Sequence, residues 1–286
     1  MLAETTIEWR SLTLYGTDGP GRMTFRTLAG WEETPPGERR RWRRPGAHGV
    51  IGGRAWAEGR TVVVTGRVFS PTERDLAVRA LEQAAPYGVE DTLSVTHAGR
   101  TLSAQATLVR RTLPRGVWGA GFFEWTLEWE VDDPLRYGDV ISDTTGLPFD
   151  TGGLRYPLYT DGDGDDVGFL DYGEFGDEGT VTLENEGSAE TWPRFTVTGP
   201  LPSGFMLTES GTGRSLMFTG AVPAGSSLFL DSATGEVTLD GTASRASQLI
   251  RSEWTPIPPG GSVTYGFYAT SPGSPTVTIE ATEAWW

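Results

Sequence analysis

Hydrophobic and polar residues alternate without a break from Phe123 to Val131. The apolar positions are Phe123, Trp125, Leu127, Trp129 and Val131, and the polar ones are Glu124, Thr126, Glu128 and Glu130. This period of two predicts a half-buried β-strand. One face presents two tryptophans to a packed second layer, and the acidic face requires water or a partner. Pro134 ends the pattern, because proline has no N–H to donate to a neighbouring strand.

Weaker patterns in the first half predict further strands and one helix. Two short strands are expected within residues 1–30, a buried strand over Thr61 to Val68, and a hairpin within residues 93–111 that turns at His97 to Arg100. A helix is expected over residues 70–85. Its signals are Ser70 as N-cap, Pro71 at the first helical position, Glu73 completing a capping box, and Leu76, Ala77, Ala80, Leu81 and Ala84 at helical spacing.

After this half the pattern changes. The stretch from Tyr137 to Gly179 is rich in Gly and Asp and predicts a linker together with the first segment of a second domain. Beyond it, short alternating pieces separated by turn residues predict a β-sandwich. These pieces contain Val181 and Leu183, Phe195 and Val197, Leu216 and Phe218, Leu228 and Leu230, Val237 and Leu239, Val263 to Ala269, and Val277 to Ala281, with a hairpin turn at Asp231 to Gly235.

Charge divides the chain at the same place. All 23 basic residues are arginines; residues 1–143 carry 18 of them against 19 Asp and Glu, whereas residues 144–286 carry 5 against 19. The two parts therefore have net charges of −1 and −14. We expect a mainly β protein with a sandwich-like N-terminal domain containing one helix (1–143) and an acidic C-terminal sandwich (144–286), whose segment 144–179 includes the linker. The acidic domain should repel nucleic acid and anionic membranes.

The densest run of charge follows a Pro-Pro-Gly break and precedes several glycines. It consists of Glu38, Arg39, Arg40, Arg41, Trp42, Arg43 and Arg44. We expect it in a long loop or arm and not inside a regular element. One interpretation is an arm that pairs with acidic surface on a neighbouring subunit, such as the face of Glu124, Glu128 and Glu130. The other is a nucleic-acid patch, because the run is basic with an interleaved aromatic. The first is favoured, since the surrounding domain is not basic.

The sequence offers few groups for catalysis. It has no cysteine, which excludes disulfides, thiolate metal sites and thiol nucleophiles. The two histidines, His48 and His97, fall in a glycine-rich loop and a predicted turn, and no G-x-S-x-G elbow is present. A carboxylate pair of the glycoside hydrolase kind stays open among 38 Asp and Glu. No signal peptide and no apolar run of the ~20 residues needed for a membrane span is found. We predict that the chain is not an enzyme and needs no cofactor.

One acidic segment has the spacing of a metal loop. Asp161, Asp163 and Asp165 alternate as calcium ligands do. Asp166 and Tyr172, however, stand where an EF-hand has glycine and glutamate. The segment is therefore predicted to be a solvated acidic loop, and no metal site is assigned.

Four tryptophans in the second half are candidates for contact with a ligand or a neighbour. Trp192 and Trp254 have the chemistry to stack on a sugar ring, although core packing is the commoner role of tryptophan in a β-sandwich. Trp285 and Trp286 are expected to be hard to bury in their own domain. They are candidates for insertion into a neighbouring subunit.

Taken in order, these landmarks resemble the siphophage distal tail proteins, the siphovirus-type tail component family. In the first half the resemblance rests on the loop of Arg44, Pro45, Gly46, His48 and Gly49, on Gly59, Arg60 and the strand that contains Gly66, on the Ser70 helix, and on Asp133 and Pro134. In the second half it rests on Gly152 and Gly153 before Pro157, on Asn185, Glu186 and Gly187, on Trp192 and Pro193, on Asp231 to Gly235, and on Trp254, Pro259 and Gly260.

The resemblance implies a structural virion protein at the tail tip. Such proteins form a ring, a homohexamer, that joins the tail tube to the baseplate or adsorption apparatus, and DNA passes through the ring without sequence-specific recognition. The implied N-terminal domain, 1–143 with its helix, builds the ring, and the implied C-terminal domain is a galectin-like sandwich facing outward. The implied partners are further copies of the chain, the tail tube protein, the tape measure protein, and baseplate hub or tail fibre proteins, with no membrane, and assembly would occur in the host cytoplasm. The alternative from another class is a carbohydrate-binding module that contacts the host cell envelope.

Overall fold

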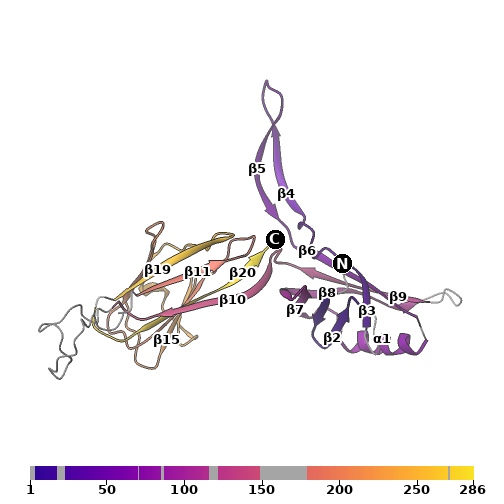
Figure 1. The fold of residues 1–286 in the computed structure, drawn as a ribbon. Helices are drawn as coiled ribbons and strands as arrows, with labels where there is room; N and C mark the ends of the chain where they lie inside the picture. Colours follow the sequence, from indigo (N-terminus) through magenta and orange to yellow (C-terminus); the bar gives the residue numbers. More distant parts are fainter. Residues whose placement is uncertain are drawn as a thin grey trace, which may run out of the picture. The chain divides into compact units, whose positions relative to one another are not determined.

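The computed structural model describes residues 4–17, 23–69, 71–84, 87–115, 122–148, 179–269 and 271–286. In this part of the chain the protein is mainly β, with one α-helix and one short 3₁₀-helix. Two units are present: residues 1–139 with 284–286 form the first, and residues 140–283 form the second (Figure 1). The division lies four residues before the boundary expected from charge and pattern, and the first unit includes the last three residues of the chain.

The first unit is built on a sheet that closes on itself. Its strands are β1 (Thr6–Trp9), β2 (Leu12–Tyr15), β3 (Met23–Ala29), β6 (Arg60–Val68), β7 (Glu90–His97), β8 (Arg100–Arg115) and β9 (Phe123–Val131). The order is β8-β7-β1-β2-β3-β6-β9, and β9 also pairs with β8. Only the pairing of β2 with β3 in this series is parallel. The sandwich-like arrangement expected from the sequence thus takes the form of a closed sheet around one core.

Strand β9 has the predicted alternation. Trp125, Leu127 and Trp129 are fully buried, whereas Glu124 and Glu130 are exposed. The ring of Trp129 lies edge-on to that of Trp9, with centroids 6.0 Å apart. The apolar face of β9 therefore lies inside the closed sheet, and its acidic face points outward.

The predicted helix and hairpin are both present. Helix α1 (Pro71–Ala84) buries Ala77, Leu81 and Ala84, and it contacts β2, β6 and β8. The expected N-cap, Ser70, lies outside the described residues. Strands β7 and β8 turn through Ala98 and Gly99, both with positive φ, which is the backbone of the tight turn that suits a β-hairpin.

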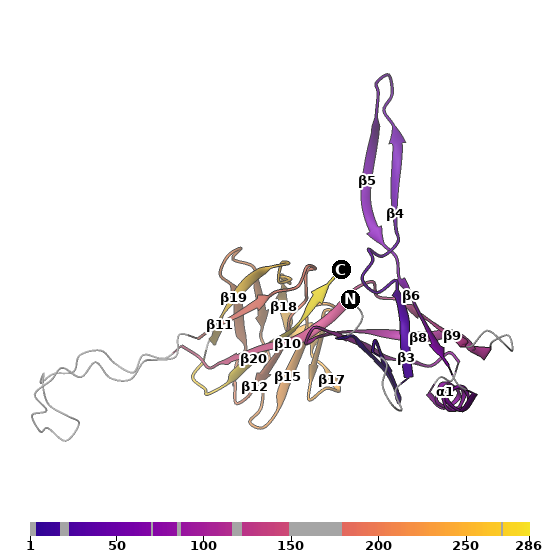
Figure 2. The same ribbon diagram turned by 45° about the vertical axis from the view of Figure 1, so that its right-hand side comes forward.

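A second hairpin corrects one expectation. The arginine run was expected outside regular structure, but β4 (Gly37–Arg43) pairs with β5 (Val50–Ala57) in a two-stranded sheet. We call residues 37–57 the hairpin arm. Figure 2 shows it extending away from the closed sheet of the first unit. Among the residues that the structure describes, β4 and β5 pair only with each other, and every residue of β4 is exposed, so these strands form without a core beneath them.

The second unit is a β-sandwich. One sheet has the order β17-β16-β15-β12-β20-β10 and the other β11-β19-β13-β14-β18, and both contribute side chains to one core. The elements are β10 (Arg136–Thr145), β11 (Thr180–Asn185), β12 (Arg194–Thr198), β13 (Phe205–Glu209), β14 (Ser215–Phe218), β15 (Ser227–Asp231), β16 (Glu236–Leu239), β17 (Ala243–Ser244), η2 (Ala246–Gln248), β18 (Leu249–Ser252), β19 (Gly261–Ala269) and β20 (Thr276–Trp285).

Four of these strands were not expected. β13, β17 and β18 fall between predicted pieces, and β10 occupies the start of the stretch from Tyr137 that was expected to hold a linker and the first segment of the second domain. Residues 137–145 of that stretch therefore lie in a strand that leads into the second unit. The remainder of that stretch up to residue 148 carries no strand, and the candidate calcium segment, 161–172, lies outside the described residues.

A buried carboxylate stabilises one turn of the sandwich. Glu209 is buried at the end of β13 and accepts hydrogen bonds from the backbone N–H groups of Gly211 and Thr212, at 2.6 and 2.7 Å, and from the Thr212 hydroxyl. Burial by itself raises the pKa of Glu209. The hydrogen bonds of Thr212 and Gly211 outweigh it and hold the pKa below its ordinary value.

Candidate functional site

The hairpin arm exposes more apolar surface than a strand in water normally does. Every residue of β4 is exposed, and so are all but one of β5. The large apolar side chains among them are Trp42, Val50, Ile51 and Trp56, which are 51–61% exposed. A two-stranded hairpin with uncovered tryptophans is at best marginally stable in water, and an exposed apolar group of this kind marks an interaction site.

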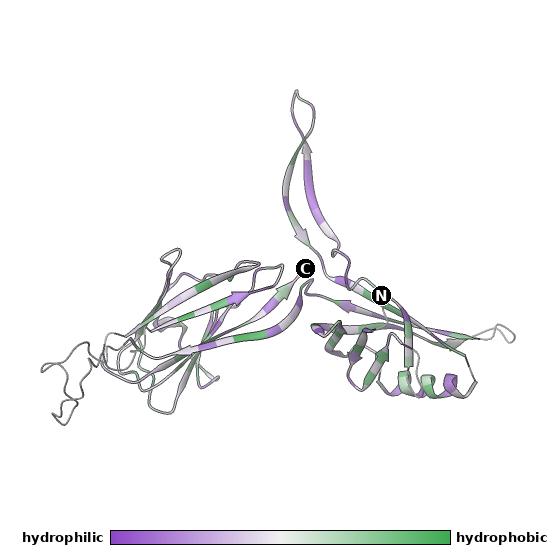
Figure 3. Ribbon diagram, in the orientation of Figure 1, coloured by the Kyte–Doolittle hydropathy of each residue, from purple (hydrophilic) through white to green (hydrophobic). Residues whose placement is uncertain are grey.

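Strand register gives the arm two faces of different chemistry. Arg39 pairs with Ala55, Arg41 with Gly52 and Arg43 with Val50, whereas Glu38 pairs with Trp56 and Trp42 with Ile51. Because side chains alternate along a strand and paired residues share a face, the odd-numbered arginines lie together on one face. We call it the basic face, with Arg39, Arg41 and Arg43; Val50 lies on it beside Arg43. The opposite face, the aromatic face, has Trp42, Ile51 and Trp56, and Arg54 lies on it beside Trp56. Figure 3 shows the hydrophilic character of β4.

Side-chain positions agree with this division. The guanidinium of Arg39 lies over Gly52 on the basic face, and its Nε donates to the carbonyl of Gly53 at 3.0 Å. The ring of Trp42 lies against Gly53, on the other side of the sheet. The guanidinium of Arg54 lies over Trp56, 4.3 Å from its ring centroid. The two glycines therefore make room for side chains that lie flat on the arm.

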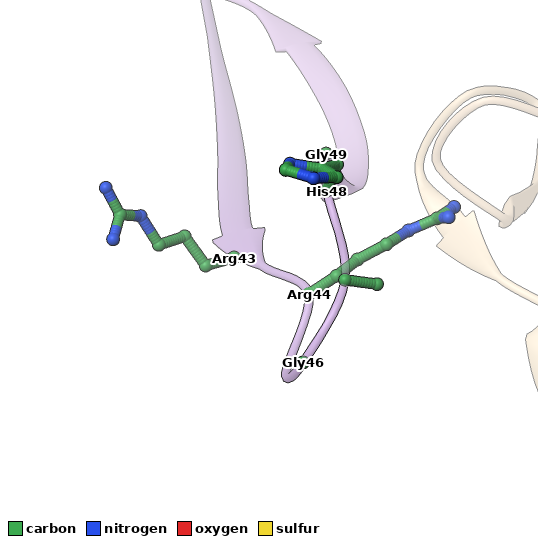
Figure 4. Close-up of a pocket in the computed structure, with 6 residues that line it drawn as sticks. Arg43, Arg44, Gly46, His48 and Gly49 are labelled. Carbon is green, nitrogen blue, oxygen red and sulfur yellow. The ribbon is translucent and has the colours of Figure 1, made fainter.

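Two arginine side chains lie at the tip of the arm. Figure 4 shows Arg43 and Arg44 extending to opposite sides of the tip, with His48 between the two strands. The six residues 43, 44 and 46–49 line an open hollow of about 500 Å³ there. His48 has no carboxylate or nucleophile beside it among the lining residues, so the tip has no catalytic arrangement.

The root of the arm is fixed in the first unit. Trp31 is 1% exposed and packs in the core of the first unit, and Arg60 is 2% exposed. The guanidinium of Arg60 donates to the carbonyl of Trp31 at 2.7 Å and to that of Pro134 at 2.9 Å. Burial, and next the positive charge of Arg136, lower the pKa of Arg60. These bonds hold the chain where it enters the arm.

A second arginine completes the root. Arg136 is 6% exposed and forms an ion pair with Glu32 at 2.9 Å. Its guanidinium also donates to the carbonyl of Trp286 and lies 5.8 Å from the ring centroid of Trp31. The root therefore combines two buried cations with backbone oxygens from three segments of the first unit.

Two of the three glutamates on the acidic face of β9 form ion pairs within the same chain. Arg67 donates to Glu124 at 2.9 Å, and Arg110 lies 3.7 Å from Glu128. Only Glu130 of the three predicted glutamates has no ion pair among the described residues. The interpretation that pairs the arginine run with this face is thereby weakened, because two of its three carboxylates already have cations within the same chain.

The two terminal tryptophans belong to the first unit. Trp285 packs against the core of that unit and not in the sandwich, and the guanidinium of Arg100 lies 3.3 Å from its ring centroid. Its insertion into a neighbouring subunit stays a prediction. Trp286 is 47% exposed, with its carbonyl bound to Arg136.

The other candidate residues take structural positions. Trp254 packs against the core of the sandwich, whereas Trp192 is 38% exposed, and sugar binding by either stays a prediction. His97 contacts the hydroxyl of Thr5 at 2.8 Å through Nδ1. In the described part of the chain no group of three or more His, Asp or Glu side chains is placed to hold a metal ion.

A hollow on the second unit was not predicted from the sequence. It has a volume of about 500 Å³ and lies beside β11, the end strand of the five-stranded sheet. Its lining consists of Val140, Ile141, Ser142, Thr182, Leu183, Glu184, Glu186 and Glu283. The available signal was the pattern of β11, where Thr180, Thr182 and Glu184 are exposed and the residues between them buried.

Comparison with known proteins gives one family and several solved structures. Residues 186–285 match the model of the siphovirus-type tail component, C-terminal domain. The crystal structure of the SPP1 Dit protein (gp 19.1), described as a paradigm of the hub adsorption apparatus in phages that infect Gram-positive bacteria, matches with a TM-score of 0.67 and 14% identity over 99% of each chain. The phage P2 baseplate in its activated conformation with Ca matches with a TM-score of 0.42 and 12% identity, over 96% of this chain and 97% of that one.

No curated protein matches the chain. Among the described residues, no helix has the length and apolar character to cross a membrane.

Proposed function

We propose that the chain is a ring-forming structural subunit of a phage tail tip, because residues 186–285 match the siphovirus-type tail component, C-terminal domain, in agreement with the resemblance drawn from the sequence. The likeness to SPP1 Dit over 99% of both chains extends the shared fold to the first unit. The matched family is a structural tail component and not an enzyme, in agreement with the absence of catalytic motifs in the sequence.

The exposed hairpin arm carries this proposal. Arg60 and Arg136 hold its root, whereas Trp42 and Trp56 on its aromatic face are 54% and 61% exposed. A rigidly held arm with exposed tryptophans is suited to pack on a neighbour, and burial of its apolar surface supplies the driving force. When the rotation from one copy to the next returns to the first copy, the copies form a closed ring in which every interface is occupied.

The finer features of the proposal follow the resemblance. The ring is a homohexamer between the tail tube and the baseplate, and DNA passes through it without sequence-specific contacts. The second unit is a galectin-like sandwich that faces outward. The partners are the tail tube, the tape measure protein, and hub or fibre proteins of the same virion, and the ring is assembled in the host cytoplasm.

The test is the solution mass of the purified chain. Light scattering over a concentration series, with electron microscopy of the same samples, should give rings whose mass is a multiple of 30.9 kDa, six-fold for the hexamer. A variant in which residues 38–56 are replaced by a short glycine turn should remain monomeric and keep its β content by circular dichroism. A full-length chain that stays monomeric at every concentration would overturn the proposal.

A further inference from the structure

One sheet of the second unit carries a row of charged side chains on its outer face. Across four neighbouring strands the paired residues are Glu280 of β20, Arg194 of β12, Asp231 of β15 and Glu236 of β16. We call these four residues the charged row. Phe195, next to Arg194, is buried in the sandwich core, and successive side chains of a strand alternate between faces, so the charged row points away from the core. Figure 2 shows β20, β12 and β15 beside one another.

The guanidinium of Arg194 is held at one of its three nitrogens. Its Nε donates to Oδ2 of Asp231 at 3.1 Å. Asp231 is itself fixed, because its Oδ1 accepts from the backbone N–H groups of Ala233 and Thr234 at 2.8 and 3.2 Å. The side chain of Arg194 is 67% exposed, and its two terminal nitrogens have no acceptor among the described residues. The row therefore presents N–H donors in a fixed direction, with carboxylate acceptors on both sides of them.

An exposed aromatic ring lies on each side of the charged row. Trp192 is two residues before Arg194, and the buried Pro193 separates them, so both side chains point outward. Phe229 is two residues before Asp231. Because β12 and β15 are antiparallel, the two rings lie on opposite sides of the row, each roughly 7 Å from it along its strand. Trp192 is 38% exposed and Phe229 is 42% exposed.

This combination of donors, acceptors and rings selects a class of ligand. A phosphate or carboxylate group only accepts hydrogen bonds, and the three carboxylates of the charged row repel it. A cation would pair with Glu280 and Glu236 but would leave the N–H groups of Arg194 without an acceptor. A hydroxyl group both donates and accepts, so it satisfies the guanidinium and the carboxylates together. The apolar C–H face of a sugar ring packs on an aromatic ring.

A protein partner fits this face less well, because little apolar area is exposed. With roughly 150–250 Å² for each aromatic side chain, the exposed fractions of Trp192 and Phe229 give on the order of 150–200 Å² together. A standard protein interface buries about 800 Å² on each partner, and more than about half of it is apolar. The neighbours of Phe229 across the strands supply hydroxyl groups instead: they are Thr196, Thr238 and, one strand further, Thr278.

We propose that the outer face of β12, β15 and β20 binds a neutral polysaccharide, with the charged row on its hydroxyl groups and with Trp192 and Phe229 against its sugar rings. Trp254, the other tryptophan with this chemistry, packs against the sandwich core and takes no part. The site lies within the second unit, so the inference does not depend on the proposed ring.

Titration calorimetry of the full-length chain tests the ligand class. The probes are short, free oligosaccharides of glucose, galactose and N-acetylglucosamine, and at least one should bind with a Kd on the order of 0.1–1 mM. Oligogalacturonate and a short DNA duplex, which are anionic, should bind at least about tenfold more weakly than that probe. Absence of binding by every neutral probe at about 10 mM, or tighter binding of an anionic one, would overturn the proposal.

Substitutions locate the site. Trp192→Ala, Phe229→Ala and Arg194→Ala should each weaken binding of the neutral probe by about tenfold or more, because aromatic and arginine side chains dominate binding energies. Arg194→Lys should weaken it by a similar factor, since lysine keeps the charge but not the planar fork of donors. The matched controls are Tyr268→Ala, 46% exposed on the other sheet, and Arg67→Ala, ion-paired on the first unit. Both should stay within about twofold of the wild type.

The controls also fix the outcomes that count against the site. An unchanged Kd in the Trp192→Ala, Phe229→Ala chain, with an unchanged circular dichroism spectrum, would overturn the proposal. So would full binding by Arg194→Lys, because the argument requires the fork and not only the charge.

The solution mass of the same variants separates this inference from the proposed function. All of them should assemble like the wild type, because the substituted residues lie outside the hairpin arm. Rings that form while no neutral oligosaccharide binds would overturn this inference and leave the proposed function standing. A chain that binds the oligosaccharide but stays monomeric at every concentration would do the reverse.

Discussion

Replacement of the two tryptophans of the hairpin arm gives a quantitative test of how the chain assembles. A tryptophan side chain has roughly 150–250 Å² to bury. Trp42 is 54% exposed and Trp56 is 61% exposed, so covering both removes on the order of 200–250 Å² from water. At about 25 cal/mol per Å², this contributes about 5–6 kcal/mol per arm. The figure is an upper value, because association also costs side-chain and rigid-body freedom.

The corresponding variants are Trp42→Ser and Trp56→Ser. Each single change should weaken assembly by up to about 100-fold, since every 1.4 kcal/mol is about a factor of ten, and the double change should give monomers at concentrations where the wild-type chain forms rings. The midpoint of dissociation in a dilution series followed by mass photometry measures the effect. Unfolding free energies should change by less than about 0.5 kcal/mol, because neither ring packs in a core.

Trp192→Ser is the matched control, since that ring is 38% exposed on the second unit and outside the arm. It should assemble like the wild type. If the Trp42→Ser, Trp56→Ser chain keeps the wild-type mass down to the same dilution, the aromatic face is not an interface and the reasoning from its exposure is refuted.

Three further changes probe the units themselves. Trp129→Ala should lower the free energy of unfolding by about 3–5 kcal/mol in urea, because the ring is fully buried; Leu76→Ala, 61% exposed on α1, should cost little, and equal losses would contradict the assigned core. Arg60→Met should leave the carbonyls of Trp31 and Pro134 without their donor and cost about 1–3 kcal/mol for each, seen as a lower Tm and faster amide exchange at the root of the arm; an unchanged root would argue against its role. Glu209 has a pKa held below its ordinary value of 4.5, so its carboxylate stabilises the fold above that pH and the contribution is lost as the pH falls through the lowered pKa. The Tm of Glu209→Gln should therefore lie below that of the wild type at pH 7 and approach it at acid pH; a constant difference would contradict the shift.

The sequence predicted the elements whose side chains divide between a core and water. β9 alternates perfectly because one face lies inside the closed sheet, and α1 was marked by its capping signals and by the spacing of Ala77, Leu81 and Ala84. Most strands of the sandwich core were predicted for the same reason, although β13, which buries Phe205 and Leu207, was not. β10 was missed, since its burial pattern has no period of two and its polar residues read as a linker.

The hairpin arm was misjudged for a physical reason. Both of its faces are exposed in the single chain, so no division into core and solvent marks the strand, and a run of arginines between glycines resembles a loop. The register that places Arg39, Arg41 and Arg43 on the face opposite Trp42 and Trp56 depends on pairing with β5. Likewise, the packing of Trp285 on the first unit joins residues far apart in sequence, and no local pattern reports such a contact.

The buried root gives the hairpin arm a mechanical property. Each strand of the arm has seven or eight residues, so its tip stands roughly 25 Å from the root. A tilt of about 5° where Arg60 holds the carbonyl of Trp31 would then displace the tip by about 2 Å over that length. The arm would therefore act as a lever. A small rotation in the first unit would be enlarged at the tip, and a force applied to the tip would act on the buried arginines of the root, Arg60 and Arg136.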